Sequence, residues 1–202
     1  MRSAIDFYLA SASPRRRELL AGIGCRFQCL QVDVDESPVP GERPEDFVLR
    51  LARRKAMAGW RLVESERQLP VLGADTVVVV DDRLLGKPDG QEGALEMLRL
   101  LSGRRHRVLT GVAMTDGTGC RETVSETIVR FRDLSDSEML RYWQSGEPRD
   151  KAGAYAIQGR GAIFVQHIAG SYSGVVGLPI FETVQLLASF GIDCWPEQGQ
   201  GA

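Results

Sequence analysis

The most prominent side chain that could perform chemistry in this sequence is an aspartate at the start of an apolar run. Asp75 follows Gly73 and Ala74, and Thr76 separates it from four consecutive valines. A carboxylate buried beside such a run is costly unless a cation or hydrogen bonds compensate it. An isolated aspartate at such a position is more often a turn or capping residue, so its role depends on what else the chain supplies.

Basic side chains that could compensate this carboxylate are spread along the chain. They are Lys55, Lys87 and Lys151, together with Arg15 and Arg16. Such cations neutralise phosphate oxygens and position a phosphate ester, while an aspartate accepts a proton from water or holds Mg²⁺. The set therefore suits a polyphosphate substrate, although spacing alone does not show that these groups meet in space.

The segment 11–17 (SASPRRR) places hydroxyls and arginines at the start of a predicted helix. Ser13 in the N-cap position followed by Pro14 predicts that the helix begins there and ends at residues 22–24. Arginines in a first turn are disfavoured by the helix dipole, but an anion bound to the free backbone N–H groups would offset that repulsion. We therefore expect a phosphate site that includes Ser11 and Ser13; the alternative is that the arginines point to solvent.

The pattern of apolar residues predicts a mixed α/β chain. Residues 77–80 (VVVV) predict a strand buried on both faces, and the following Asp81–Asp82 pair predicts a hairpin turn. Ser135 and Glu138 form a capping box, which marks a helix start. The predicted strands span 6–10, 26–32, 71–80, 105–115, 120–132, 162–168 and 172–177, and the predicted helices span 14–22, 44–65, 90–102, 135–145 and 178–190.

Two loops carry further candidate residues. Residues 151–159 (KAGAYAIQG) are mostly small and are followed by Arg160 and Gly161, which is typical of a loop whose backbone comes close to a ligand or another strand. Asp35 and Glu36 lie in an acidic loop that contains proline. Acids in such a loop are most often solvated, but they could also help to hold a divalent cation.

Composition and charge disfavour several classes of protein. The chain has 202 residues, of which 43% are apolar and 26% charged, and a net charge of −2, which is ordinary for a globular protein with one substantial core. That charge supplies no global field for nucleic acid or an anionic membrane, so the basic clusters 15–17 and 53–55 give nucleic-acid binding only weak support. We expect a single domain over residues 1–202, without a linker.

Cysteine and histidine usage indicates neither a metal cluster nor a disulfide framework. The four cysteines lack CxxC spacing, and the two histidines are isolated from each other. No apolar run approaches the roughly 20 residues of a membrane span, and the first residues lack the apolar core of a signal peptide. A cytoplasmic protein with reduced thiols is therefore the expectation.

The common nucleotide-binding and hydrolase motifs are absent from the sequence: there is no Walker A, GxGxxG, HExxH or GxSxG pattern. Four other motifs, in this order, resemble the signature of the Maf family, a family of nucleoside triphosphate pyrophosphatases that is also linked to septum formation. They are residues 11–20 (SASPRRRELL), 73–76 (GADT), 86–88 (GKP) and 151–159 (KAGAYAIQG). The resemblance extends from residue 7 to about residue 190.

This resemblance implies a fold and an activity. The fold would be similar to that of the inosine triphosphate pyrophosphatases, an elongated mixed α/β sheet flanked by helices, with two lobes and a central cleft. The activity would be hydrolysis of a nucleoside triphosphate between its α and β phosphates, giving a monophosphate and pyrophosphate with a divalent metal cation, Mg²⁺ or Mn²⁺. The triphosphate is then the expected partner and a homodimer the expected assembly, with no nucleic acid or membrane bound.

The resemblance also assigns roles to individual residues. Asp75 falls on the proposed general base, and three residues fall on positions that set base specificity: Arg15, Thr76 and Gln158. This set resembles the branch acting on dTTP and UTP; the branch acting on 7-methyl-GTP tends to carry a Gln after the aspartate and a Glu in place of Gln158. A Gln amide both donates and accepts hydrogen bonds, so it can pair with a pyrimidine edge. Ala156 departs from the family pattern, where Gly is frequent, and its methyl group could tighten the pocket.

The remaining expected roles concern phosphates and metal. Three basic residues match family positions that hold phosphates: Arg16, Lys55 and Lys87. The pattern of the chain itself adds three further phosphate-binding candidates: Ser11, Ser13 and Lys151. Asp75 and Glu36 are the expected metal ligands, since Glu36 and its neighbour Asp35 fall near an acidic family position.

A second hypothesis belongs to a different class of function. The same motifs would serve a nucleotide-binding regulator of cell division whose hydrolysis is incidental. The sequence does not separate the two hypotheses, whereas a measurement of turnover does.

Overall fold

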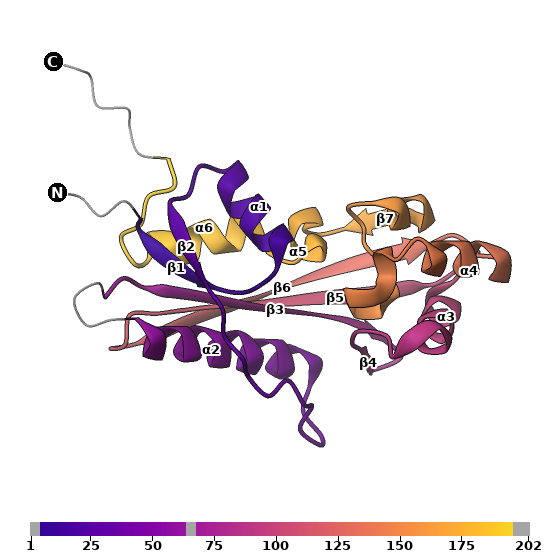
Figure 1. The fold of residues 1–202 in the computed structure, drawn as a ribbon, viewed down its shortest axis with the longest axis horizontal. Helices are drawn as coiled ribbons and strands as arrows, with labels where there is room; N and C mark the ends of the chain where they lie inside the picture. Colours follow the sequence, from indigo (N-terminus) through magenta and orange to yellow (C-terminus); the bar gives the residue numbers. More distant parts are fainter. Residues whose placement is uncertain (1–4, 64–67, 196–202) are drawn as a thin grey trace, which may run out of the picture.

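The sheet of this protein runs along the longest axis of the molecule (Figure 1). A computed structural model describes residues 5–63 and 68–195, in which the strands are β1 (Phe7–Ala10), β2 (Phe27–Leu30), β3 (Val71–Val80), β4 (Arg83–Leu85), β5 (Arg105–Thr115), β6 (Cys120–Phe131) and β7 (Val165–Ala169). Their order is β2-β1-β3-β5-β6-β7, with β4 paired to β3 beside that path. Pairing is parallel among β2, β1 and β3 and antiparallel elsewhere. The predicted mixed sheet is confirmed.

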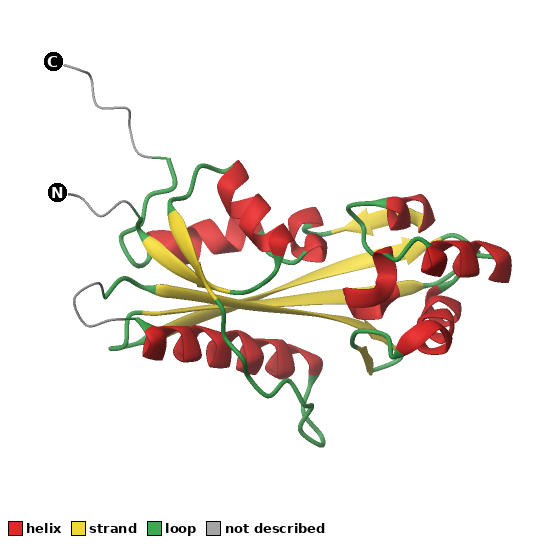
Figure 2. Ribbon diagram, in the orientation of Figure 1, coloured by secondary structure: helices red, strands yellow, loops and turns green. Residues whose placement is uncertain are grey.

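Helices cover both faces of the sheet (Figure 2). One face carries α2 (Pro44–Leu62), and the other carries α1 (Pro14–Gly22), α5 (Tyr172–Val176) and α6 (Ile180–Ala188). Towards the far end of the long strands lie α3 (Gly90–Leu101) and α4 (Asp136–Gln144), followed by the short 3₁₀ turns η2 (Glu147–Asp150), η3 (Ala152–Ala154) and η4 (Arg160–Phe164). None of the helices in the described ranges has the length and apolar character needed to cross a membrane.

The central strand β3 contributes to the core on both of its faces. Val77 packs against residues of α2, whereas Leu72 packs among residues of α1 and α6 and Val78 packs among residues of α3. Successive side chains of a strand point to opposite faces of the sheet. Asp75 therefore lies on the face covered by α2, and its neighbour Thr76 lies on the face covered by α1.

One edge of β3 is paired at both ends and open in the middle. On the edge opposite β5, β1 pairs with β3 as far as Gly73, and β4 pairs with it from Val78 onward. No described strand lies beside residues 74–77 on this edge, because β1 ends at Ala10 and the chain turns into the loop before α1. Breaks of this kind at the ends of parallel strands are common ligand sites. The break exposes the edge of β3 at Asp75.

The helix α2 lies against the sheet at backbone-contact distance. A Cβ atom added to Gly73 of β3 would lie 2.3 Å from the carbonyl oxygen of Ala52, and one added to Gly111 of β5 would lie 2.6 Å from that of Val48. Only glycine at these two positions permits so close an approach. The approach brings Lys55, in the middle of α2, over the central strand.

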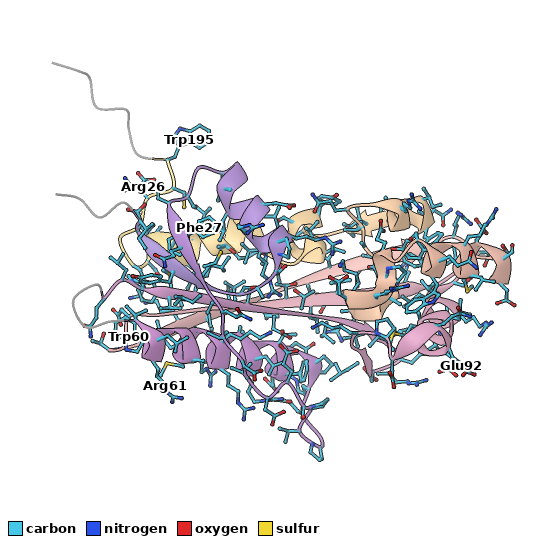
Figure 3. All side chains as sticks on the ribbon, in the orientation of Figure 1. Arg26, Phe27, Trp60, Arg61, Glu92 and Trp195 are labelled. Atoms are coloured by element: carbon cyan, nitrogen blue, oxygen red, sulfur yellow. The ribbon has the colours of Figure 1, made fainter. Side chains whose placement is uncertain are left out.

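The C-terminal end of α2 packs against the turn between β5 and β6 through an indole ring. Trp60, labelled in Figure 3, lies in the last turn of α2, and a Cβ atom added to Gly117 would lie 2.3 Å from its ring atom Cζ2. Gly117 is in the turn between β5 and β6 and has a φ of +85°, a left-handed conformation that favours glycine. This contact fixes the position of α2 along the strands.

Two predicted strands near the C-terminus differ from the structure. The prediction of a strand at 172–177 is wrong: the hydroxyl of Ser171 accepts a hydrogen bond from the backbone N–H of Gly174 at 3.0 Å and caps a helical turn, which becomes α5. The predicted strand at 162–168 is displaced, because its first residues belong to η4 and β7 begins at Val165.

The other predicted elements are confirmed, with small differences at their ends. The capping box of Ser135 opens α4 as predicted, with both reciprocal hydrogen bonds present. The last helix begins at Ile180 rather than at residue 178, because Pro179 occupies its N-cap position. The predicted end of α2 at residue 65 lies outside the described residues.

Replacing Gly73 with alanine tests the contact between α2 and β3. The added methyl group would overlap the carbonyl oxygen of Ala52, so the free energy of unfolding should fall by about 1–3 kcal/mol. Denaturant unfolding measures the change. In the control Gly93→Ala, in α3, the added Cβ meets nothing within 4 Å, and stability should stay the same or rise by at most about 1 kcal/mol. Equal losses in both variants would contradict a backbone contact at Gly73.

Candidate active site

A cleft of about 680 Å³ adjoins the break in the β3 edge. Its size is typical of a site for a small molecule. Its walls come from the loop between β1 and α1, the middle of β3, the residues after β4 and the loop around residues 150–158. Apart from Asp35, the residues predicted for the site line this cleft: Ser11, Ser13, Arg15, Arg16, Glu36, Lys55, Asp75, Thr76, Lys87, Lys151 and Gln158.

Lys55 joins the two carboxylates of the cleft. Its Nζ lies 2.7 Å from Oδ1 of Asp75 and 2.6 Å from Oε1 of Glu36. The side chains of Lys55 and Asp75 are only 12% and 11% exposed, whereas that of Glu36 is 48% exposed. The ammonium group therefore compensates a carboxylate that is nearly removed from water, as the apolar run after Asp75 requires.

The environment of Asp75 makes it a stronger base than an exposed aspartate. Burial is the largest influence and raises its pKa above the usual range, while the charges of Lys55 and Arg16 act in the opposite direction. A carboxylate with a raised pKa is better matched to proton transfer near neutral pH. Because the folded pKa exceeds the unfolded one, the stability that this group contributes falls as pH rises from the unfolded to the folded pKa, and it stays lower above that window.

Of the two acids predicted in the acidic loop, only Glu36 reaches the cleft. Burial raises its pKa, but the hydrogen bond and charge of Lys55, together with the charges of Lys87 and Arg16, outweigh burial and hold the pKa below the usual glutamate range. Asp35 does not line the cleft; its carboxylate instead accepts the backbone N–H of Ser37 at 2.9 Å. The structure thus separates two neighbours that the sequence could not distinguish.

Arg16 is a buried link between segments. Its Nε donates to the carbonyl oxygen of Gly177 at 2.8 Å, Nη1 to the hydroxyl of Ser11 at 3.3 Å and Nη2 to that of Thr76 at 3.2 Å. Only 8% of the residue is exposed. These bonds tie the start of α1 to β3 and to the end of α5, so Arg16 holds the wall of the cleft together.

The hydroxyl of Thr76 belongs to a chain of hydrogen bonds with one direction. Thr110 Oγ1, on the paired strand β5, donates its single proton to the carbonyl oxygen of Gly174 at 2.8 Å. Thr110 Oγ1 lies 2.9 Å from Thr76 Oγ1, so it must accept the proton of the Thr76 hydroxyl. The Thr76 hydroxyl oxygen in turn accepts a hydrogen bond from Arg16. The proton of the Thr76 hydroxyl is therefore committed, and this hydroxyl can only accept from a ligand.

Several cationic groups of the cleft are available to a ligand. Lys87 is exposed on the segment after β4, and Lys151 pairs with the exposed carboxylate of Asp150. The backbone N–H of Gly153 donates to the carbonyl oxygen of Gly86 at 3.0 Å. That bond joins the two loops that carry these lysines, as the prediction of a close-approach loop at 151–159 requires.

The N-terminus of α1 faces the same space. Ser13 takes the predicted N-cap position, but its hydroxyl makes no capping hydrogen bond in the described structure. Within residues 5–63 and 68–195, no protein group accepts from the backbone N–H of Arg15 or Arg16. An uncapped helix start of this kind, next to basic side chains, is suited to bind a phosphate or carboxylate.

The groups that support the predicted side chains were not predicted from the sequence. Thr110 orients Thr76 through the register of β3 and β5, which hydrophobic patterning does not reveal. Tyr155, on the cleft wall, hydrogen-bonds Nε2 of His106 at 2.9 Å, and burial lowers the pKa of His106 to about 4, so that this imidazole is neutral. The small-residue motif at 151–159 was the signal for Tyr155, whereas no local signal identified His106.

The cleft and the sheet together define a class of protein: a mixed α/β protein whose cleft brings cationic side chains beside a buried carboxylate. The family within this class follows from the sequence. Residues 6–190 match the family described as Maf-like protein, and the chain belongs to this Maf family.

Relatives that are named for an enzymatic activity match nearly the whole chain. The sequence is 57% identical over 189 residues to the dTTP/UTP pyrophosphatase of Alkalilimnicola ehrlichii, which covers 92% of this chain and 93% of that protein. It is 52% identical to the dTTP/UTP pyrophosphatase of Hahella chejuensis, covering 94% of each chain. The solved structure of the Staphylococcus aureus Ham1 protein matches 64% of this chain and 72% of its own at 14% identity, with a TM-score of 0.39. That likeness is too partial to define the fold, which rests on the strand order above.

Removing the ammonium group of Lys55 should raise the pKa of Asp75 further, because Lys55 is the strongest influence that lowers it. A ¹³C NMR titration of labelled aspartate carboxyl groups in Lys55→Met measures the shift. Asp81 is an internal reference, since Arg104 holds its pKa below the usual range and neither residue contacts the cleft. The account of the buried pair is wrong if Asp75 titrates in the usual aspartate range in both proteins.

Proposed function

We propose that this chain hydrolyses dTTP and UTP to the nucleoside monophosphate and pyrophosphate. The observation that carries this proposal is the meeting, in one cleft, of a buried carboxylate, available cations and side chains that fit a pyrimidine. Relatives at 50–57% identity are named dTTP/UTP pyrophosphatase, which supports the proposal.

The triphosphate is bound by groups that lack strong protein partners. Lys87 is exposed, and among the described residues Lys151 pairs with Asp150 alone. The Asp150 side chain is 72% exposed, so water screens its attraction for Lys151 and phosphate oxygens can compete for this lysine. The free N–H groups and hydroxyls at the start of α1, Ser11 and Ser13 among them, add a second phosphate contact. Arg16, which is occupied by protein acceptors, shapes this contact by holding α1 in place.

Asp75 is the general base in this proposal. Lys55 holds its Oδ1, and no described side chain hydrogen-bonds Oδ2, which is left to accept a proton from water. The water oxygen then bonds to a phosphorus atom of the bridge between the α and β phosphates. The P–O bond of that bridge breaks, and the monophosphate and pyrophosphate separate. The accepted proton returns to solvent, so that Asp75 is ionised for the next turnover.

The residues present fit a divalent cation that is shared with the substrate. Within the described residues, no group of three or more His, Cys, Asp and Glu side chains could hold a metal alone. Asp75 and Glu36 nevertheless converge on the same Lys55 nitrogen, and one or two carboxylates plus phosphate oxygens and water are the usual ligands of Mg²⁺ at a nucleotide. When bound there, the cation would neutralise phosphate charge and acidify water.

The acceptor hydroxyl of Thr76 favours thymine and uracil over cytosine. Both preferred bases carry a proton on N3, which an acceptor can bind, whereas N3 of cytosine is itself an acceptor and would face the lone pair of Thr76. Gln158 alone would not discriminate, because its amide can turn and pair with either base. A site that leaves buried polar groups unpaired rejects a ligand strongly. Arg15 also lines the cleft and is the third residue proposed to select the base, with Thr76 and Gln158.

Asp75→Asn should abolish catalysis with little effect on binding. Loss of a general base lowers kcat by roughly 10²–10⁴-fold, while dTTP binding, measured by isothermal titration calorimetry, should persist. Asp82→Asn, at an exposed hairpin-turn residue with a φ of +58° that asparagine tolerates, is the matched control and should keep full activity. Full pyrophosphate release by Asp75→Asn would refute the mechanism. Tight binding with no turnover in the unchanged protein would favour the regulator hypothesis.

Gln158→Glu should weaken turnover of dTTP and UTP. A carboxylate cannot donate to O4 of the base, so kcat/KM for both should fall by about 10–100-fold, as measured by pyrophosphate release across a panel of nucleoside triphosphates. Gln166→Glu, on the exposed part of β7, adds the same charge outside the cleft and should leave the preference unchanged. An unaltered preference in Gln158→Glu would reject a role for Gln158 in base selection.

A further inference from the structure

A carboxylate outside the cleft binds the backbone of the loop that carries Gln158. Oε2 of Glu147 accepts the N–H of Arg160 at 2.9 Å, and Oε1 accepts the N–H of Gly161 at 3.0 Å. Glu147 lies in η2, after the end of α4, and does not line the cleft. Its hydrogen bonds therefore hold the loop backbone from outside the cleft.

Tyr142 extends this contact to the other side of the loop. Its hydroxyl donates to Oε1 of Glu147 at 2.7 Å and accepts the backbone N–H of Ala156 at 3.0 Å. Its ring packs edge-on against Phe164 with the centroids 4.9 Å apart. Tyr142 and Glu147 together hold the backbone both before and after Gln158, at residues 156 and 160–161.

The loop leaves little room for these two side chains to move. A Cβ atom added to Gly159 would lie 2.6 Å from Oε2 of Glu147, and one added to Gly161 would lie 2.7 Å from the hydroxyl of Tyr142. Glycine at both positions lets the backbone close around the carboxylate and the hydroxyl. We define residues 156–161, with these contacts, as the clamped loop.

The orientation of Gln158 depends on this clamp. Its side chain is exposed, and no hydrogen bond from another described residue fixes it. Where a side chain has no partner of its own, the position of its backbone decides where its amide can reach. A displacement of about 1 Å at such a group is enough to reduce the rate of an enzyme strongly.

The carboxylate of Glu147 is ionised at neutral pH. Burial raises its pKa, but the two backbone N–H groups and the Tyr142 hydroxyl, with the nearby charge of Arg15, outweigh burial and lower it. Hydrogen bonds to an ionised acceptor are roughly twice as strong as neutral ones. The clamp is therefore strong although it consists of few contacts.

From these contacts we infer that Glu147 and Tyr142 are positioning residues for base selection: they hold the clamped loop so that Gln158 presents its amide to the base. The inference rests on the proposed function, in which Gln158 contacts the pyrimidine. It adds two residues that do not touch the substrate but decide how well one base is distinguished from another.

Two substitutions remove the clamp without changing the shape of the side chain much. In Glu147→Gln, the amide nitrogen cannot accept, so a backbone N–H of the loop loses its partner. In Tyr142→Phe, the hydroxyl between Ala156 and Glu147 is lost. The matched control is Glu138→Gln on α4, because the carboxylate of Glu138 also accepts a backbone N–H, that of Ser135 at 3.1 Å, but makes no contact with the clamped loop.

The first measurement is hydrogen–deuterium exchange of the clamped loop, which requires no activity. Exchange of residues 156–161 should be at least about tenfold faster in Glu147→Gln and Tyr142→Phe, and unchanged in Glu138→Gln. Unchanged exchange in both test variants would overturn the inference, because the contacts would then not hold the loop.

The second measurement separates positioning from general stability. In both test variants KM for dTTP should rise about tenfold with kcat within a factor of three, and the preference for dTTP over dCTP should fall about tenfold, whereas Glu138→Gln should keep the preference at a similar melting temperature. Faster loop exchange with an unaltered preference would overturn the inference. If the unchanged protein hydrolyses neither dTTP nor UTP, the proposed function fails, and calorimetric affinities for dTTP and dCTP then replace KM and decide the inference in the same way.

Discussion

The site depends on one lysine that satisfies a carboxylate where water is nearly excluded. Lys55 lies within hydrogen-bond distance of both Asp75 and Glu36, and it can do so only because α2 touches the backbone of β3. Removal of one partner from a buried ion pair generally costs about 3–5 kcal/mol. Gly73 and Gly111, which have no side chain to keep α2 away, are therefore as necessary to the site as the charged residues themselves.

The open edge of β3 turns this buried pair into a site that a ligand can reach. Asp75 and Thr76 are adjacent in the chain but point to opposite faces of the sheet, one towards α2 and the other towards α1. The break between β1 and β4 lets one cleft contact both. In the proposed function, the reacting phosphates would lie on the side of Lys55, and the base would lie on the side of Thr76 and Gln158. One strand would thus supply both the chemistry and the selection of the base.

The sequence, largely through its resemblance to the Maf family, allowed side chains that line the cleft to be predicted, but not the groups that hold them. The apolar run beside Asp75 and the Ser13–Pro14 helix start are local signals, and the structure places both in the cleft. The pairing of Thr110 with Thr76 depends on strand register, and the open edge depends on where β1 and β4 end; both are long-range features that local patterning does not contain. The segment 172–177 was mispredicted because its β-branched residues favour a strand, whereas the cap at Ser171 and the surrounding packing favour a helix.

Cleavage of a pyrimidine nucleoside triphosphate between its α and β phosphates is tested most directly by identifying the products. The purified protein would be incubated with dTTP and Mg²⁺ or Mn²⁺ in water enriched in ¹⁸O, and the products would be resolved by mass spectrometry. The expected result is dTMP and pyrophosphate in equal amounts, with one ¹⁸O atom incorporated per turnover. Formation of dTDP and phosphate, or the absence of turnover with either metal, would contradict the proposed reaction.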